Sequence, residues 1–389
     1  MSDIKELAPD LEEPAFVSWR QVQIEAKREE EWQNKLSIWE GLKIYRTAVF
    51  WSVVASSCIV QEAYDTLLLG SLFALPAFKE HFGHDAGGTA GYQISASWQA
   101  GIQQGANMGS LMGVFLGAFL VDRFGYKYSI LGNLILLAPI IALVTFAPNL
   151  GALLAGEILC GIPWGVFSTL AEAYASEICP QGLRGYLTTF VNLCWVLGHS
   201  IGAGVLRAAN NITGKWSYRM PFAVQWVWIP ILVPLLVFAP ESPYWFDRKG
   251  RLENAEKTVR RIAPAAEQDR VQEIVSSLVR TNHFEREVKA GTSFTDCFKG
   301  VDRRRTEISY DMTVGPVAYA IVGETSSTRL RNKTVGLARA SYNVFSICFG
   351  VLMPYMLNPT KWNWAGKTGF FGLESVSSAS SGHTSGYQS

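Results

Sequence analysis

The chain has 389 residues, with 34 basic and 33 acidic side chains, and its net charge is +1. This balance argues against a nucleic-acid partner, which would favour a basic patch or stripe. The six cysteines form no C-x-x-C pair and lie mostly in apolar runs, so neither a metal site nor a disulfide framework is expected.

Polar and apolar residues divide the chain into five regions. Residues 1–46 and 240–310 are charged and polar, and 374–389 form a Ser-rich tail. Apolar residues are concentrated in 47–239, with a smaller block in 311–373. The first region lacks the short apolar run of a secretory signal, so the first membrane span is expected to serve as its own insertion signal.

Six apolar stretches are long enough to cross a bilayer, which takes roughly 20 residues of helix. These stretches are 47–70, 98–121, 128–147, 150–171, 186–206 and 221–239. Most of the connectors between them are short. Few polar residues recur at helical spacing along the apolar stretches. This pattern predicts an all-α membrane bundle rather than a soluble helical protein.

Basic residues in the connectors predict the orientation of the bundle. Arg123 and Lys127 follow the second span and Arg184 follows the fourth, whereas 147–151 contains no basic residue. The positive-inside rule therefore places the amino terminus and the even-numbered connectors in the cytoplasm. Asn211, in an Asn-Ile-Thr sequon, then lies outside, and the sequence leaves open whether it is glycosylated.

A short repeat links the two ends of the chain. Glu177 precedes Arg184 by seven residues, and Glu324 precedes Arg331 by the same spacing. A leucine comes directly before each arginine, and an apolar helix follows in both cases. The repeat predicts two homologous halves, as in transporters that are built from internal repeats.

Several separated motifs resemble one known family. The stretch GVFLGAFLVDRFGYKYS at 113–129 resembles the loop signature of the major facilitator superfamily, and PESPYWFDRKGR at 240–251 resembles the sugar-porter signature after the sixth span. Further segments resemble fungal α-glucoside (maltose) permeases, and the resemblance covers about 40–373. These segments are 62–78, 156–165, 174–180, 183–198 and 310–319.

The resemblance implies twelve spans in two six-helix halves and proton symport of a disaccharide by alternating access. A proton gradient would supply the energy, so no cofactor and no enzymatic activity are expected. The lipid bilayer and a small sugar are the expected partners, nucleic acid is not, and a homo-oligomer is an option. The family implies the plasma membrane, or retention in the endoplasmic reticulum if the chain is truncated.

The chain departs from the family pattern in its second half. Spans seven to nine and the start of ten are missing between residues 309 and 310, and the tail replaces span twelve. The apolar run 312–323 is about 18 Å long as a helix, so we expect it to be re-entrant or surface-lying, with 335–357 as a seventh span. We therefore predict a complete six-helix amino-terminal half and a partial carboxyl-terminal half.

Three functions remain open on the sequence. The chain is an active carrier, with or without a second copy; an inactive remnant or mis-assembled chain; or a sugar-sensing membrane protein without transport. The missing spans favour the second reading, and the short tail gives no support to the third.

Two acidic residues are candidates for proton coupling. Asp65 lies in the first span, close to Glu62, and Glu157 opens the fourth. A carboxylate at membrane depth usually faces a cavity or partner and marks an ion path. The resemblance implies that Asp65 is the coupling acid, and a helix-capping carboxylate is the alternative. Glu157 is either a second coupling carboxylate or an external interface residue.

Sugar recognition needs polar side chains and aromatic faces in a largely apolar pocket. His199 stands where the family pattern has Gln, and it shares one helical face with Asn192 and Trp195. Polar contacts between helices and interfacial Trp belts are the alternative for each candidate. The candidates are Gln99, Gln103, Asn107, Asn192, Trp195, His199, Trp226 and Asn343.

A set of charged motif residues is expected to clamp the cytoplasmic side during alternating access. We expect Asp122 to lie before a helix start, where the helix dipole favours an anion, and Arg123 to pair with a carboxylate from another span end. Ordinary positive-inside loops are the alternative. The residues are Asp122, Arg123, Gly125, Lys127, Glu177, Arg184, Glu241, Arg251, Glu324 and Arg331.

Overall fold

The structure is a computed structural model that describes residues 19–33, 37–73, 75–85, 92–263, 268, 270–287 and 331–357. The predicted re-entrant run 312–323, Glu324 and the tail 374–389 lie outside the described residues. The predictions for them are therefore not tested.

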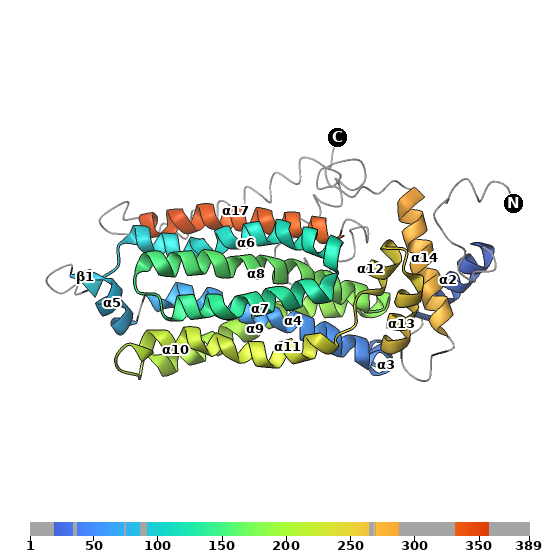
Figure 1. Ribbon diagram of the computed structural model, residues 1–389, viewed down its shortest axis with the longest axis horizontal. Helices are drawn as coiled ribbons and strands as arrows, with labels where there is room; N and C mark the ends of the chain where they lie inside the picture. Colours follow the sequence, from blue (N-terminus) through green and yellow to red (C-terminus); the bar gives the residue numbers. More distant parts are fainter. Residues whose placement is uncertain are drawn as a thin grey trace.

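Long helices lie lengthwise beside one another and form the body of the molecule (Figure 1). Each predicted span falls on one or more of them, with boundaries that differ by a few residues. The helices are α4 (Arg46–Leu72), α6 (Ala96–Phe124), α7 (Tyr126–Thr145), α8 (Leu150–Ile178), α9 (Gln181–Ala209), and the run of α10 (Trp216–Val224), η2 (Gln225–Val227) and α11 (Trp228–Phe238).

Five stretches among the described residues are long and apolar enough to cross a membrane: α6, α7, α8, α9 and the run from α10 to α11. A sixth results if α4 counts as one span with the short α5 (Pro76–Phe82), which is bent from it by 71°. The polar side chains Gln61, Glu62 and Asp65 lower the apolar character of α4, and all three are buried in the bundle. The fold is thus an all-α membrane bundle, as predicted.

Shorter helices cap one end of the bundle, the end that we predict to be cytoplasmic (Figure 1). The helix α2 packs on α14, where Arg270 pairs with Glu29 and Arg280 with Glu30, each at 3.0 Å. The cap helices are α2 (Trp19–Gln33), α3 (Ile38–Ile44), α12 (Pro243–Arg248), α13 (Leu252–Ile262) and α14 (Val271–Glu287).

The opposite end of the bundle carries α5 and a short hairpin of β1 (His84–Asp85) and β2 (Tyr92–Gln93). The two strands pair antiparallel, with His84 opposite Gln93. Asn211 is exposed in the connector between α9 and α10, at this same end of the molecule (Figure 1).

Glycines bring α6 and α8 into backbone contact. A Cβ added at Gly113 would lie 2.0 Å from the Ile162 carbonyl oxygen, and one added at Gly165 would lie 2.1 Å from that of Ser110. Gly109 and Gly161 make the same kind of contact one turn away. Small residues allow such close packing of helices in lipid, where van der Waals contact drives helix association.

The last described helix, α17 (Arg331–Leu357), lies alongside α6 (Figure 1). It contains the predicted seventh span 335–357, although it is not among the five membrane-competent stretches. Asn343 donates a hydrogen bond to the Ser110 hydroxyl at 3.0 Å, and Gly336 lies against Val114. The helix α17, which we predict to belong to the second half, is therefore packed on α6.

We predict that Gly113→Ala destabilises the bundle, because the added methyl group would overlap a backbone carbonyl of α8. Overpacking of this kind costs about 1–3 kcal/mol, which should lower the melting temperature of the detergent-solubilised protein by several degrees. Gly132→Ala on α7 is the matched control, since nothing lies within 4 Å of the added carbon. Equal melting temperatures for the two variants would contradict the proposed contact.

Candidate functional site

Two buried carboxylates meet in the middle of the bundle. Asp65 on α4 is 1% exposed and Glu157 on α8 is fully buried, and their carboxyl groups interact with each other. Gln225 on η2 donates a hydrogen bond to Asp65 Oδ1. Neither acid forms an ion pair with a described residue. The structure thus brings together the two acids that the sequence selected separately.

Two adjacent carboxylates in a low-dielectric site cannot both be ionised without a large cost, because each disfavours the charge of the other. A site of this kind holds a proton that belongs to the pair rather than to either residue. The pair therefore has the chemistry of a proton-binding site at membrane depth.

An ion pair lies nearly one helical turn away and joins α4 to α17. Glu62 on α4 accepts a hydrogen bond from Arg339 on α17 at 2.9 Å, and both side chains are largely buried. The Arg339 guanidinium also lies 5.0 Å from the ring centres of Trp195 and Tyr342, within reach of a cation–π interaction.

Sequence analysis missed Arg339 and Gln225. A usable signal existed for Arg339, since a lone cation inside an apolar stretch requires an acidic partner in the bundle. Gln225 carries no such signal, because a polar amide near a span end is common and its partner is known only from the packing.

The sugar-binding candidates fall into three groups. Asn107, Asn343, Trp195 and His199 lie around α17 and α9: Asn107 donates to the Ser346 hydroxyl at 3.2 Å, and the rings of Trp195 and His199 are 5.8 Å apart. Asn192 and Gln103, on α9 and α6, are half-buried.

Two other candidates make local or interhelical contacts. Gln99 donates to the Ile94 carbonyl at 2.8 Å at the start of α6, and Trp226 donates to the Ala138 carbonyl on α7 at 3.0 Å. Trp226 thus makes a polar contact between helices, which was the alternative to a role in sugar binding.

Glu177 organises the capped end of the bundle. Arg248 on α12 donates to both of its carboxyl oxygens, at 3.0 and 3.3 Å. The Tyr126 and Ser242 hydroxyls donate to it as well. Arg184 instead donates to the Ser176 carbonyl at 2.7 Å. The ion-pair partner of Glu177 is therefore Arg248, which sequence analysis did not select.

Glu241 caps the start of α7. Its carboxylate accepts hydrogen bonds from the backbone N–H groups of Tyr126, Lys127 and Ser242, at 2.9, 3.1 and 2.9 Å. Gly125 precedes the helix with φ of 87°, a left-handed conformation that favours glycine, and a Cβ there would collide with the Glu241 carboxylate.

The expectation for Asp122 is wrong in its detail. Asp122 is the third-last residue of α6, not the residue before a helix start, and Glu241 supplies the negative charge at the start of α7. Asp122 pairs instead with Lys333 of α17 at 3.5 Å. Its position at a helix carboxyl end, where the dipole disfavours an anion, is compensated by that lysine.

The remaining motif residues take no part in this cluster. Arg123 and Arg251 are exposed, and Arg251 is the residue before α13. Arg331 is the first residue of α17, and its side chain lies outside the described structure.

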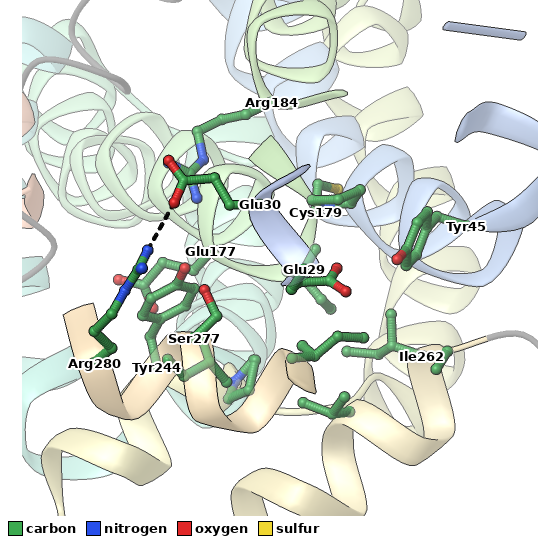
Figure 2. A pocket seen from close by; sticks show the side chains of 17 residues that line it. Glu29, Glu30, Tyr45, Glu177, Cys179, Arg184, Tyr244, Ile262, Ser277 and Arg280 are labelled. Carbon is green, nitrogen blue, oxygen red and sulfur yellow. Dashed lines mark hydrogen bonds and ion pairs between the residues drawn. The ribbon is translucent and has the colours of Figure 1, made fainter. Parts of the chain in front are cut away.

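A cavity of about 70 Å³ lies between the ends of the spans and the cap helices (Figure 2). Figure 2 shows Glu177, Arg184 and the Glu30–Arg280 pair of α2 and α14 around it, with Glu30 drawn beside Arg184. Apolar side chains such as Ile262 line the rest. The cavity is thus lined both by the charged motif residues and by the cap helices that cover them.

Comparison with known proteins decides the family. The sequence profile described as "Sugar (and other) transporter" matches residues 51–309 and 306–373. The chain belongs to this sugar transporter family. A maltose permease of Saccharomyces cerevisiae is 30% identical over 479 residues, which cover 95% of this chain and 77% of the permease. A general alpha-glucoside permease of the same yeast is also 30% identical, over 87% of this chain and 72% of that protein. The relatives are transporters rather than enzymes.

The fold is that of the major facilitator superfamily. The proton:xylose symporter XylE bound to 6-bromo-6-deoxy-D-glucose superposes with a TM-score of 0.64 at 17% identity, over 82% of this chain and 90% of that one. A partially occluded, inward-open form of XylE from E. coli gives a TM-score of 0.60 at 16% identity, over 82% of this chain and 96% of that one.

The chain is shorter than its relatives inside the matched region. The alignment with the maltose permease is 479 residues long, whereas this chain has 389, so at least ninety positions have no counterpart here. The two profile matches meet at 306–309, next to the junction where the sequence motifs indicate missing spans.

Burial raises the pKa of the Glu241 carboxyl to about 7, and nearby Glu177 adds to this effect, although the three N–H donors oppose it. The folded protein therefore binds this proton more tightly than the unfolded chain, whose value is near 4.5. Stability from this group is present below pH 4.5 and is lost as pH rises towards 7, at no more than ~1.4 kcal/mol per pH unit.

We predict that Glu241→Gln removes this part of the pH dependence, so that the melting temperature of the variant falls less between pH 5 and pH 7 than that of the parent protein. Melting of the solubilised protein across this range measures the difference. Glu256→Gln, on the exposed surface of α13, is the control and should keep the parent slope. If the melting temperature of Glu241→Gln changed with pH as much as that of the parent protein, Glu241 would not titrate between pH 5 and pH 7.

Proposed function

We propose that this protein carries an α-glucoside such as maltose across the membrane together with a proton. The observation that supports this proposal most is the buried pair of Asp65 and Glu157, which offers a proton site inside a sugar-transporter fold. The printed functions of the relatives support the substrate class, since both the maltose permease and the general alpha-glucoside permease are 30% identical.

Proton binding and movement of the halves are connected through α4 in this proposal. Asp65, which shares the proton with Glu157, and Glu62, which pairs with Arg339 of α17, lie on the same helix and nearly one turn apart. A change of charge at Asp65 is therefore felt by the ion pair that joins the halves, because electrostatic interactions are strong at low dielectric. No cofactor is needed, since the proton gradient drives the cycle.

The sugar would bind beside this network. Asn107, Asn192, Trp195, His199 and Asn343 offer hydrogen bonds and aromatic faces, the features of a sugar site. At the capped end, the Glu177–Arg248 pair and the Glu241 cap would hold the spans together and release them during alternating access.

Because its second half is short, a single copy of this chain would not form a complete transport path. The family resemblance predicts that spans seven to nine and the start of ten are missing, so a single copy would lack helices that line the sugar path from the carboxyl half. We propose that an active carrier is a homo-oligomer in which a second copy supplies the missing wall. A protein that folds and binds sugar but does not move it is the second candidate, favoured by the same missing segment.

Labelled-maltose uptake, in cells that lack their own α-glucoside permease, tests the proposal. We expect uptake that rises with an inward proton gradient and that Asp65→Asn reduces at least tenfold, because the amide cannot take up a proton. Glu256→Gln on the cap should leave uptake unchanged. Surface expression is measured for every variant.

The two candidate functions give different results. Exchange of labelled for unlabelled maltose should survive in Asp65→Asn if only proton coupling is lost. No uptake and no exchange by protein that reaches the surface would refute transport, and maltose-dependent thermal stabilisation of the same protein would then favour the binding function.

A further inference from the structure

An open pocket lies at the carboxyl end of α6, away from the acidic pair. Its lining consists of Phe119, Asp122, Arg123 and Phe124 of α6 and Lys249, which follows α12. Transport in the preceding proposal makes no use of this pocket.

Two of the basic side chains that line the pocket have no acidic partner among the described residues. Asp122 is paired with Lys333 of α17 at 3.5 Å. Arg123 and Lys249 are exposed, and neither forms an ion pair with a described residue. The Arg123 guanidinium lies 5.8 Å from the centre of the Phe124 ring, so this cation is held beside an aromatic face.

The same pocket has an apolar side. Phe119 is 62% exposed and Phe124 is 49% exposed, although both belong to a helix that is apolar enough to cross a membrane. A phenyl ring has no polar atom, so an exposed Phe on such a helix packs against lipid acyl chains. The pocket therefore places two cations beside phenyl rings that face the acyl chains.

We propose that this pocket binds the phosphate of an anionic phospholipid in the cytoplasmic leaflet. The planar Arg123 guanidinium donates two hydrogen bonds to the phosphate and Lys249 supplies a second, more compact positive charge. The acyl chains lie against Phe119 and Phe124. Basic pockets on the cytoplasmic side of membrane helices have this preference for anionic head groups.

The proposal favours a lipid over a soluble anion because the pocket is open and partly apolar. A free phosphate would leave Phe119 and Phe124 exposed, whereas a phospholipid covers them. The bound lipid would also bridge the end of α6 to the turn after α12, two segments that lie far apart in the sequence.

Native mass spectrometry of the full chain, from nanodiscs that contain phosphatidylserine in phosphatidylcholine, tests the proposal. We expect the parent protein to retain phosphatidylserine over phosphatidylcholine. The double variant Arg123→Gln/Lys249→Gln should lose this preference, with about a fivefold weaker retention for each removed cation. The control Lys257→Gln/Arg260→Gln removes the same charge from α13 and should retain the lipid.

Three outcomes would overturn the site. Equal retention in the double variant would show that the two cations do not bind the lipid. Equal retention of phosphatidylcholine would show that the head-group charge is not recognised. Inorganic phosphate that displaces the retained lipid at modest concentration would assign the pocket to a soluble anion. None of these measurements depends on whether the protein transports sugar.

Discussion

Charge at bilayer depth has to be balanced inside the protein, because lipid offers neither counter-ions nor hydrogen bonds. Four ionisable side chains of this bundle meet that constraint in two ways. Glu62 on α4 and Arg339 on α17 neutralise each other, and Asp65 and Glu157 share a site in which one bound proton reduces the charge of the pair from −2 to −1. The rest of the architecture serves to hold these groups at the required positions on α4, α8 and α17.

The backbone contact between α6 and α8 helps to position these ionisable groups. Glycines on both helices allow the approach, and α17 then packs on α6 with Gly336 against Val114. Glu157 extends from α8 and Arg339 from α17, so both positions depend on the same packed helices. The spacing of small residues on α6 and α8 thus helps to determine where the charged side chains of Glu157 and Arg339 lie.

The sequence predicted the fold well because hydropathy is a property of single stretches. The spans, and the choice of Asp65 and Glu157 as candidates, need no tertiary information. The identity of partners does: Glu177 binds Arg248 rather than Arg184 or Arg123, and Glu241 rather than Asp122 caps α7. Several arginines and carboxylates lie near span ends, and the sequence does not show which of them pair. Only the packing of the helices determines the partners.

The Glu62–Arg339 pair also gives the retained helix α17 a specific role in this shorter chain. The chain lacks at least ninety positions of its relatives, yet it keeps the helix that carries the arginine. A shorter chain without α17 would remove the counter-charge of Glu62, which would then have to bind a proton to stay buried. The retained α17 thus supplies the counter-charge of a carboxylate that lies on α4.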